Sequence, residues 1–152
     1  MSPQTSPDRD RADISDLMIT FVRSLDDQAW DAYAETFVED GVFEIMGQQR
    51  VGRPDIAAGP ARDLSRYART QHFSTNHQIN LDGDSAEARH DLFAVHVPDS
   101  AHPERHADIG GVYRCSCVRT PRGWRFAKVR LEILWNAGSD FALARHGEAT
   151  AQ

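Results

Sequence analysis

A stripe of apolar residues with helical spacing is the first clear pattern in the chain. Apolar residues recur at steps of three and four between positions 14 and 25, as on a helix with one buried face. They are Ile14, Leu17, Met18, Phe21, Val22 and Leu25. The polar residues 1–9, which include prolines, predict a disordered lead that ends at an N-cap, Asp8 or Asp10.

Two shorter helices with a strand between them are expected next. The first of these helices carries Trp30 and Phe37 on one apolar face and ends before Gly41. A short strand over residues 42–46 and a turn follow. A third helix opens on a Gly-Arg-Pro sequence and is expected to end near Arg69, because proline suits the first helical turn.

Four long segments of β-type follow the helices. They cover residues 71–81, 85–97, 106–119 and 124–135. Helices followed by consecutive strands are typical of an α+β fold. We expect a cone-shaped, strongly curved and mostly antiparallel sheet covered by three N-terminal helices. This single domain would span residues 10–138, with a tail or short lid over 139–152, and its hollow would suit a small molecule.

Composition narrows the class of partner. The chain has 152 residues, 40% apolar and 26% charged, which suits one globular domain. Its net charge of −6 argues against a nucleic-acid partner. No apolar run approaches the roughly 18 residues that cross a membrane, and the N-terminus lacks a signal-peptide stretch. Cys115 and Cys117 would share one strand face, where they cannot bridge, so a cytoplasmic protein is expected.

Asp26 is the first candidate for chemistry. On a helical projection it borders the buried stripe, whereas Asp27 faces away. It stands at the C-terminal end of the helix, where a carboxylate costs about 0.3–1 kcal/mol against the helix dipole. A compensating partner is therefore expected. Two interpretations stay open, a catalytic carboxylate or a side chain that only caps the following turn.

Strand alternation groups several polar side chains on faces that could line the hollow. His72 shares a face with Ser74 and Asn76, and this set faces either water or a polar pocket. His90 and His96 share a face otherwise made of alanine and leucine, where apolar surroundings would keep imidazole neutral. In the alternative, the opposite face is the core and both histidines are solvated.

Aromatic and aliphatic side chains complete the candidate site. Tyr113 lies on an expected inner face, where its phenol either enters the hollow or packs by its ring. The residues expected to contact an apolar, ring-shaped ligand are Phe21, Phe43, Asn76, His90, Leu92, Ile133 and Trp135. The residues expected on an exposed outer face that would support a homodimer or homotrimer are Val112, Val118 and Phe126.

Three segments of the chain carry a family resemblance. They are residues 21–31 (FVRSLDDQAWD), 69–73 (RTQHF) and 123–126 (GWRF). In order and spacing they resemble the SnoaL-like branch of the nuclear-transport-factor-2-like superfamily, over about residues 10–138. This branch includes scytalone dehydratase, lindane dehydrochlorinase and bile acid 7α-dehydratase. The resemblance implies a cone-shaped α+β fold with a pocket inside.

The resemblance also implies roles for individual residues. Asp26 and His72 correspond to the family's Asp–His dyad, and His96 to a second pocket histidine. The family's active-site tyrosines fall on Leu25 or Phe21 and on Ile45 in this chain, so His96 or Tyr113 would replace their phenols.

The resulting hypothesis is a cofactor-independent lyase, isomerase or cyclase, with dehydration preferred. In it, Asp26 orients His72, which removes a proton from a small apolar, cyclic or polyketide-like substrate, and His96 or Tyr113 acts on the departing oxygen. The chain lacks the GxGxxG, P-loop and GxSxG motifs of other enzyme classes. Two alternatives stay open, a non-catalytic ligand-binding or assembly domain and a metal-assisted enzyme that uses the same carboxylate and imidazoles.

Overall fold

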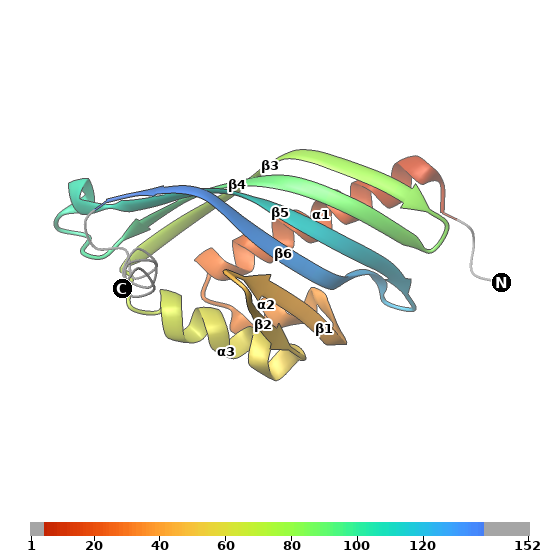
Figure 1. The fold of residues 1–152 in the computed structure, drawn as a ribbon, viewed down its shortest axis with the longest axis horizontal. Helices are drawn as coiled ribbons and strands as arrows, with labels where there is room; N and C mark the ends of the chain where they lie inside the picture. The colour runs from red at the N-terminus through yellow and green to blue at the C-terminus, as the bar shows by residue number, and fades with distance from the viewer. Residues whose placement is uncertain (1–4, 139–152) are drawn as a thin grey trace.

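A six-stranded sheet arches over three helices in the computed structural model, which describes residues 5–138 (Figure 1). The strand order is β2-β1-β6-β5-β4-β3, and all neighbours are antiparallel except β1 and β6, which are parallel. The predicted α+β class with a curved, mostly antiparallel sheet is confirmed. The predicted tail or lid lies outside the described residues.

The first helix, α1 (Pro7–Asp26), ends where the apolar stripe predicted. It begins earlier than predicted, because Ser6 rather than Asp8 or Asp10 accepts the capping hydrogen bond, and the expectation of a disordered lead is wrong for residues 7–9. Asp10 does not cap the helix but links it to the sheet. It is buried, accepts two hydrogen bonds of 2.8 Å from the Arg119 guanidinium and one of 3.1 Å from Trp124, and so ties α1 to the last hairpin.

The next segment departs most from the sequence prediction. Helix α2 (Trp30–Glu35) ends before Phe37, which is fully buried and begins strand β1 (Phe37–Ile45). The strand β2 (Gln48–Val51) was not predicted, since its side chains are mostly exposed and show no apolar alternation. Helix α3 (Arg53–Leu64) ends at Leu64, before the predicted boundary near Arg69.

The four long strands were predicted closely. They are β3 (Arg69–Asp82), β4 (Ser85–Val97), β5 (Ala107–Thr120) and β6 (Gly123–Ala137), with a short 3-10 turn, η1 (Pro103–Arg105), before β5. Alternation on β4 and β5 places one face of each strand against α1 and the pocket. Cys115 and Cys117 are buried free thiols on that face, as expected.

Two β-bulges change which side chains point inward. On β3 the register shifts between Thr75 and Gln78, and Asn76 adopts a positive φ of 54°. On β6 the register against β5 shifts between Gly110 and Gly111, so Trp135 lies over Gly110 on the outer face. A Cβ on Gly110 would fall 2.1 Å from the Trp135 indole nitrogen, which explains the glycine at this position.

The outer face of the sheet differs from the prediction. Phe126 and Val112 are buried, and Phe126 points into the core because of a further register shift between Ser116 and Cys117. The large apolar side chains exposed on the sheet include Phe73, Phe93 and Trp135, whose rings follow one another at centroid distances of 6.1 and 6.0 Å. The homodimer or homotrimer stays a prediction. None of the helices within residues 5–138 is long and apolar enough to cross a membrane.

The core lies between α1 and the concave face of the sheet. Phe21 is fully buried at its centre and contacts the rings of Tyr33, Phe37, Tyr113 and Phe126 at centroid distances of 4.8 to 6.0 Å. Close packing of this kind fixes side chains in single rotamers. The walls of the adjoining pocket are therefore firmly held.

Candidate active site

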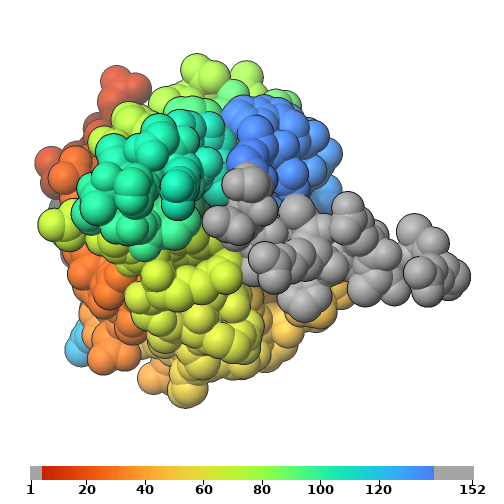
Figure 2. Space-filling model, turned by 90° about the vertical axis from the view of Figure 1, so that its left-hand side faces the viewer, coloured from red at the N-terminus to blue at the C-terminus, as the bar shows by residue number. Residues whose placement is uncertain are grey.

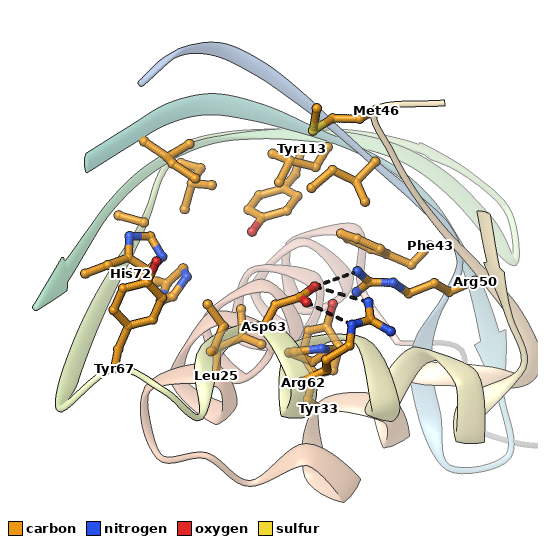
Figure 3. Close-up of a pocket in the computed structure, with 18 of the residues that line it drawn as sticks. Leu25, Tyr33, Phe43, Met46, Arg50, Arg62, Asp63, Tyr67, His72 and Tyr113 are labelled. Carbon is orange, nitrogen blue, oxygen red and sulfur yellow. Dashed lines mark hydrogen bonds and ion pairs between the residues drawn. The ribbon is translucent and has the colours of Figure 1, made fainter. Parts of the chain in front are cut away.

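A cavity of about 870 Å³ opens between the concave sheet and α3 (Figure 3). This volume suits a ligand of one or a few rings. Its walls are mostly apolar, and the aliphatic and aromatic lining residues include Leu25, Phe43, Ile45, Leu64, Leu92, Ala94, Ile109 and Leu131. Figure 2 views the end of the molecule where the segment between β4 and β5 lies above the residues that follow α3.

Asp26 and His72 meet at one end of this cavity. The Nδ1 atom of His72 lies 2.6 Å from Oδ1 of Asp26, although 46 residues separate them in the chain. Asp26 also accepts the backbone N–H of His72 at 2.9 Å and the hydroxyl of Thr70 at 3.0 Å. These three donors provide the compensation that a carboxylate at a helix C-terminus requires.

This arrangement fixes the tautomer of His72. A carboxylate oxygen accepts hydrogen bonds, so the Nδ1 atom that faces Asp26 carries a proton. In the neutral imidazole the other nitrogen, Nε2, then holds a lone pair. The side chain of His72 is 5% exposed and lines the cavity, so this basic nitrogen is held on the side of a bound ligand.

His96 lies next to His72 with a different hydrogen-bond geometry. Its ring meets that of His72 edge to face at a centroid distance of 5.4 Å. Its Nδ1 atom lies 3.2 Å from the carbonyl oxygen of Ala107, which can only accept, so Nδ1 carries the proton. Burial, followed by the neighbouring His72, lowers the pKa of His96 to about 4, so the imidazole is neutral at pH 7.

Two phenols face the cavity from other elements. Tyr113 on β5 points its hydroxyl into the space between the walls, and Tyr33 on α2 lines the same cavity (Figure 3). Neither hydroxyl has a hydrogen-bond partner among residues 5–138. Burial raises the pKa of both phenols above 10, so both keep their protons at neutral pH and can donate to a ligand.

The opposite end of the cavity is charged. Arg50 on β2 reaches over the cavity wall and donates to Asp63 at 3.1 Å, and Arg62 donates to the same carboxylate at 3.0 Å. Figure 3 shows this group on the far side of the pocket from His72. The cavity therefore has an acid–base end and a cationic end, with apolar walls between them.

A second hydrogen-bonded group of histidines lies behind the cavity wall. Ser74 contacts Nδ1 of His90 at 2.6 Å and Nε2 of His77 at 2.8 Å, and Nδ1 of His77 contacts Ser15 at 2.9 Å. The His90 ring is fully buried and stacked on Tyr113 at 4.7 Å, and its Nε2 atom has no partner within the described residues. Burial, then the charge of His77, lowers the pKa of His90 to about 3.

The buried histidines predict a loss of stability in mild acid. A histidine of the unfolded chain binds its proton near pH 6.5, whereas His90 binds one only near pH 3. The contribution of neutral His90 to the free energy of unfolding is therefore complete above pH 6.5 and is lost as the pH falls below that value. Each such histidine lowers the free energy of unfolding by about 1.4 kcal/mol per pH unit in this window. Denaturant titrations between pH 7 and 4 measure how the free energy of unfolding depends on pH. In His90→Gln this dependence should be less steep than in the wild type by the amount that one histidine contributes.

Leu92 provides the control for this experiment. It is buried two residues further along β4 and does not titrate, so Leu92→Val should lower stability equally at every pH. A pH slope in His90→Gln as steep as in the wild type would contradict the assignment.

The structure brings together only part of the predicted site. His72, His96, Tyr113, Phe43 and Leu92 line the cavity, and Asp26 stands directly behind His72. Four residues predicted to contact the ligand do not line the cavity, because they lie in the core, against it or on the outer face of the sheet. They are Phe21 and His90 in the core, Ile133 against the core, and Trp135, which is exposed on the outer face.

Asn76 is also misplaced by the sequence prediction. The bulge on β3 turns its side chain outward, where it donates to Asp91 at 2.7 Å, and brings His77 to the inner face beside Ser74. The expectation that His72, Ser74 and Asn76 share one face is therefore wrong for Asn76.

Sequence reasoning missed Tyr33, Tyr67 and Arg50. Tyr33 lies on the apolar face of α2, a position that indicated only a core residue. Tyr67 follows α3 in what was expected to be helix, and its ring lies 5.1 Å from that of His96. Arg50 stands on the unpredicted strand β2, and no periodic pattern showed where its side chain would reach.

The metal-assisted alternative lacks a ligand set in the described part of the chain. No group of three or more His, Cys, Asp or Glu side chains within residues 5–138 is arranged to hold a metal ion. Asp26 and the histidines near it form hydrogen-bonded pairs and ring contacts instead.

The comparison with known families agrees with this architecture. The sequence model of a family described as a SnoaL-like domain matches residues 9–130. No curated protein matches the chain.

Solved structures share the fold. An NTF2-like protein with a cystatin-like fold from Novosphingobium aromaticivorans is 28% identical, with a TM-score of 0.73 and coverage of 91% of this chain and 88% of its own. A protein of the same organism, provisionally named an aromatic ring hydroxylase, is 26% identical, with a TM-score of 0.79 and coverage of 89% and 96%. A hexachlorocyclohexane dehydrochlorinase, LinA type 2, shows likeness in fold at 20% identity, with a TM-score of 0.75 and coverage of 88% and 93%.

Proposed function

The chain belongs to the SnoaL-like domain family, and on that premise we propose that it is a cofactor-independent lyase that eliminates water from a small cyclic substrate. One of the solved structures that share the fold, the dehydrochlorinase above, carries a name that describes the loss of hydrogen chloride, which is an elimination reaction. Dehydration is the same class of reaction with hydroxide as the leaving group.

The observation that carries the proposal is the 2.6 Å contact between Asp26 and Nδ1 of His72 at the wall of a cavity. The carboxylate holds the imidazole with its lone pair on Nε2 and stabilises the imidazolium that forms when this nitrogen takes a proton. A residue that merely capped the turn after α1 would not need an imidazole of this orientation.

The proposed step removes a proton from the carbon beside a carbonyl group. Nε2 of His72 takes the proton. The C–H electron pair forms a double bond to the next carbon, and the C–O bond between that carbon and its hydroxyl group breaks. The proton on His72 then passes to the departing hydroxide, so that water leaves and the neutral imidazole returns. Without a leaving group, His72 can return the proton to a different carbon of the conjugated enolate, which gives isomerisation and regenerates the neutral imidazole.

Tyr113 is the better candidate for the group that stabilises the carbonyl oxygen during this step. Its O–H points into the cavity and stays protonated, because burial raises the pKa of the phenol. His96 is less suited, since the proton of its neutral ring is on Nδ1 and faces the Ala107 carbonyl. A preorganised donor of the Tyr113 kind stabilises a developing enolate.

Deuterium exchange tests the proton transfer without knowledge of the natural substrate. The probe 1-tetralone has an apolar double ring and an exchangeable carbon beside its carbonyl. In deuterated buffer we expect the wild type to speed exchange at this carbon by about 10-fold or more, and His72→Gln to leave it at the buffer rate. Mass spectrometry measures the exchange. No acceleration by a wild type that binds the probe would favour a ligand-binding domain instead.

A further inference from the structure

We infer that the substrate carries a carboxylate, which Arg50 binds at the end of the cavity opposite His72. The inference deepens the proposed function, because it takes the reacting end of the substrate to lie at His72. It adds a class of substrate, an amphiphilic acid with an apolar ring, and assigns Arg50 as the residue that fixes its orientation.

The charge around the cavity differs in sign from that of the whole protein. The chain carries a net charge of −6. In contrast, the charged side chains other than histidine that line the cavity within residues 5–138 are Arg50, Arg62, Arg66 and Asp63. A cationic pocket on an acidic protein concentrates anionic ligands there, whereas the rest of the surface repels them.

Arg50 is held as part of the pocket wall. Its side chain is only 17% exposed, although β2 is an edge strand whose other side chains are exposed. The guanidinium lies 5.6 Å from the centre of the Phe43 ring and directly against Gly59 of α3. A Cβ on Gly59 would fall 1.8 Å from Nη1, so the glycine leaves the space that the guanidinium occupies.

The guanidinium of Arg50 has N–H donors that could bind a ligand. Arginine has five N–H groups, and the hydrogen bond that Arg50 makes within residues 5–138 is the one from Nη2 to Asp63. Asp63 also accepts from Arg62, so a single carboxylate serves two guanidinium groups. A carboxylate suits the remaining donors because its two oxygens match the fork of a guanidinium.

Arg62 and Arg66 are less suited to this role. The side chain of Arg62 is 70% exposed at the rim, where solvent screens its charge. Arg66 lies over the ring of Tyr67 and donates to its hydroxyl at 2.8 Å. Arg50 is therefore the half-buried cation that an acid within the apolar cavity would meet.

Binding of a matched pair of ligands tests the inference independently of catalysis. The probes are 2-naphthoate and 2-naphthamide, which share a ring and differ in charge. Calorimetry or NMR titration of the wild type should show the acid binding about 10-fold or more tightly than the amide, since hydrogen bonds between charged groups are the stronger ones. His72→Gln should keep this preference, so a failure of the proposed catalysis would not be mistaken for a failure of acid binding.

Three variants assign the preference to Arg50. Arg50→Gln should bind acid and amide equally. Gly59→Ala keeps the charge but displaces the guanidinium, so it should weaken acid binding without harm to a helix that favours alanine. Arg89→Gln removes one charge from the outer face and should leave the preference unchanged. Equal binding of the two probes by the wild type, no binding of the acid, or an undiminished preference in Arg50→Gln would overturn the inference.

Discussion

Replacing His72 with glutamine is expected to lower kcat/KM by about 10³-fold, the largest effect of any single change in this protein. The substitution removes the nitrogen that takes the proton from carbon, and a positioned general base contributes about 10²–10⁴-fold to a rate. This corresponds to roughly 3–5 kcal/mol of the activation barrier. The glutamine side chain keeps a polar group near Asp26, so the fold should persist. Steady-state kinetics on the substrate, or the rate of tetralone exchange, measures the loss.

The control is a histidine outside the site. His106 is exposed and pairs with Asp108 at 2.7 Å on the surface, and His106→Gln should leave kcat/KM unchanged. Substrate binding by His72→Gln should remain within a few-fold of wild type, because the apolar walls and Arg50 are intact. Turnover by His72→Gln close to that of the wild type would show that another group takes the proton.

Replacing Asp26 with asparagine is expected to lower kcat by about 10²-fold or more with little change in KM. Asp26 accepts from three donors, the Thr70 hydroxyl and the backbone and ring N–H groups of His72. An amide offers a single oxygen and turns an N–H₂ toward donors that need an acceptor. The ring of His72 then loses the charge that stabilises its imidazolium and can adopt the other tautomer, which presents N–H to the substrate.

The neighbouring aspartate supplies the control for this variant. Asp27 follows α1 with an exposed side chain, so Asp27→Asn should leave kcat and KM at wild-type values. Chemical denaturation should show both proteins folded. An Asp26→Asn enzyme within three-fold of the wild type would reduce Asp26 to a residue that caps the turn.

Much of the fold follows from local patterns in the sequence. The stripe from Ile14 to Leu25 predicted α1 and placed Asp26 at its end, and alternation predicted the long strands within about two residues. These patterns are strong because each element buries one continuous face. The inner positions of His96 and Tyr113 follow from the same alternation, since neither lies beyond a bulge.

The side chains assigned to the wrong face of a strand lie where one residue breaks the period of that strand. A bulge adds a residue to a strand without any change in composition. Strict alternation therefore predicts the wrong sheet face for Asn76 and Trp135, which lie at or beyond a bulge. Glycine pairs such as Gly110 and Gly111 are a weak signal of such a site. The positive φ of Asn76 fits a residue type that tolerates this conformation, and asparagine is depleted in regular strands, so Asn76 is itself a weak signal of the bulge.

The cationic end of the cavity could not be predicted for a different reason. Arg50 reaches the site through the length of its side chain, from a short edge strand whose sequence is polar throughout. Its position depends on Gly59, which adjoins it only after α3 has packed against β2. Such contacts are set by tertiary packing, whereas sequence periodicity reports only which face of an element is buried.

The central claim is that Asp26 holds His72 in the tautomer with a basic nitrogen facing the cavity. Nitrogen-15 NMR of the histidine rings tests this claim directly, since protonated and bare ring nitrogens have distinct chemical shifts. For the neutral ring of His72 the account predicts a protonated Nδ1 and an unprotonated Nε2, with a downfield Nδ1 proton that disappears in Asp26→Asn and persists in Asp27→Asn. A His72 ring protonated on Nε2 alone, or one whose spectrum is the same in Asp26→Asn, would contradict it.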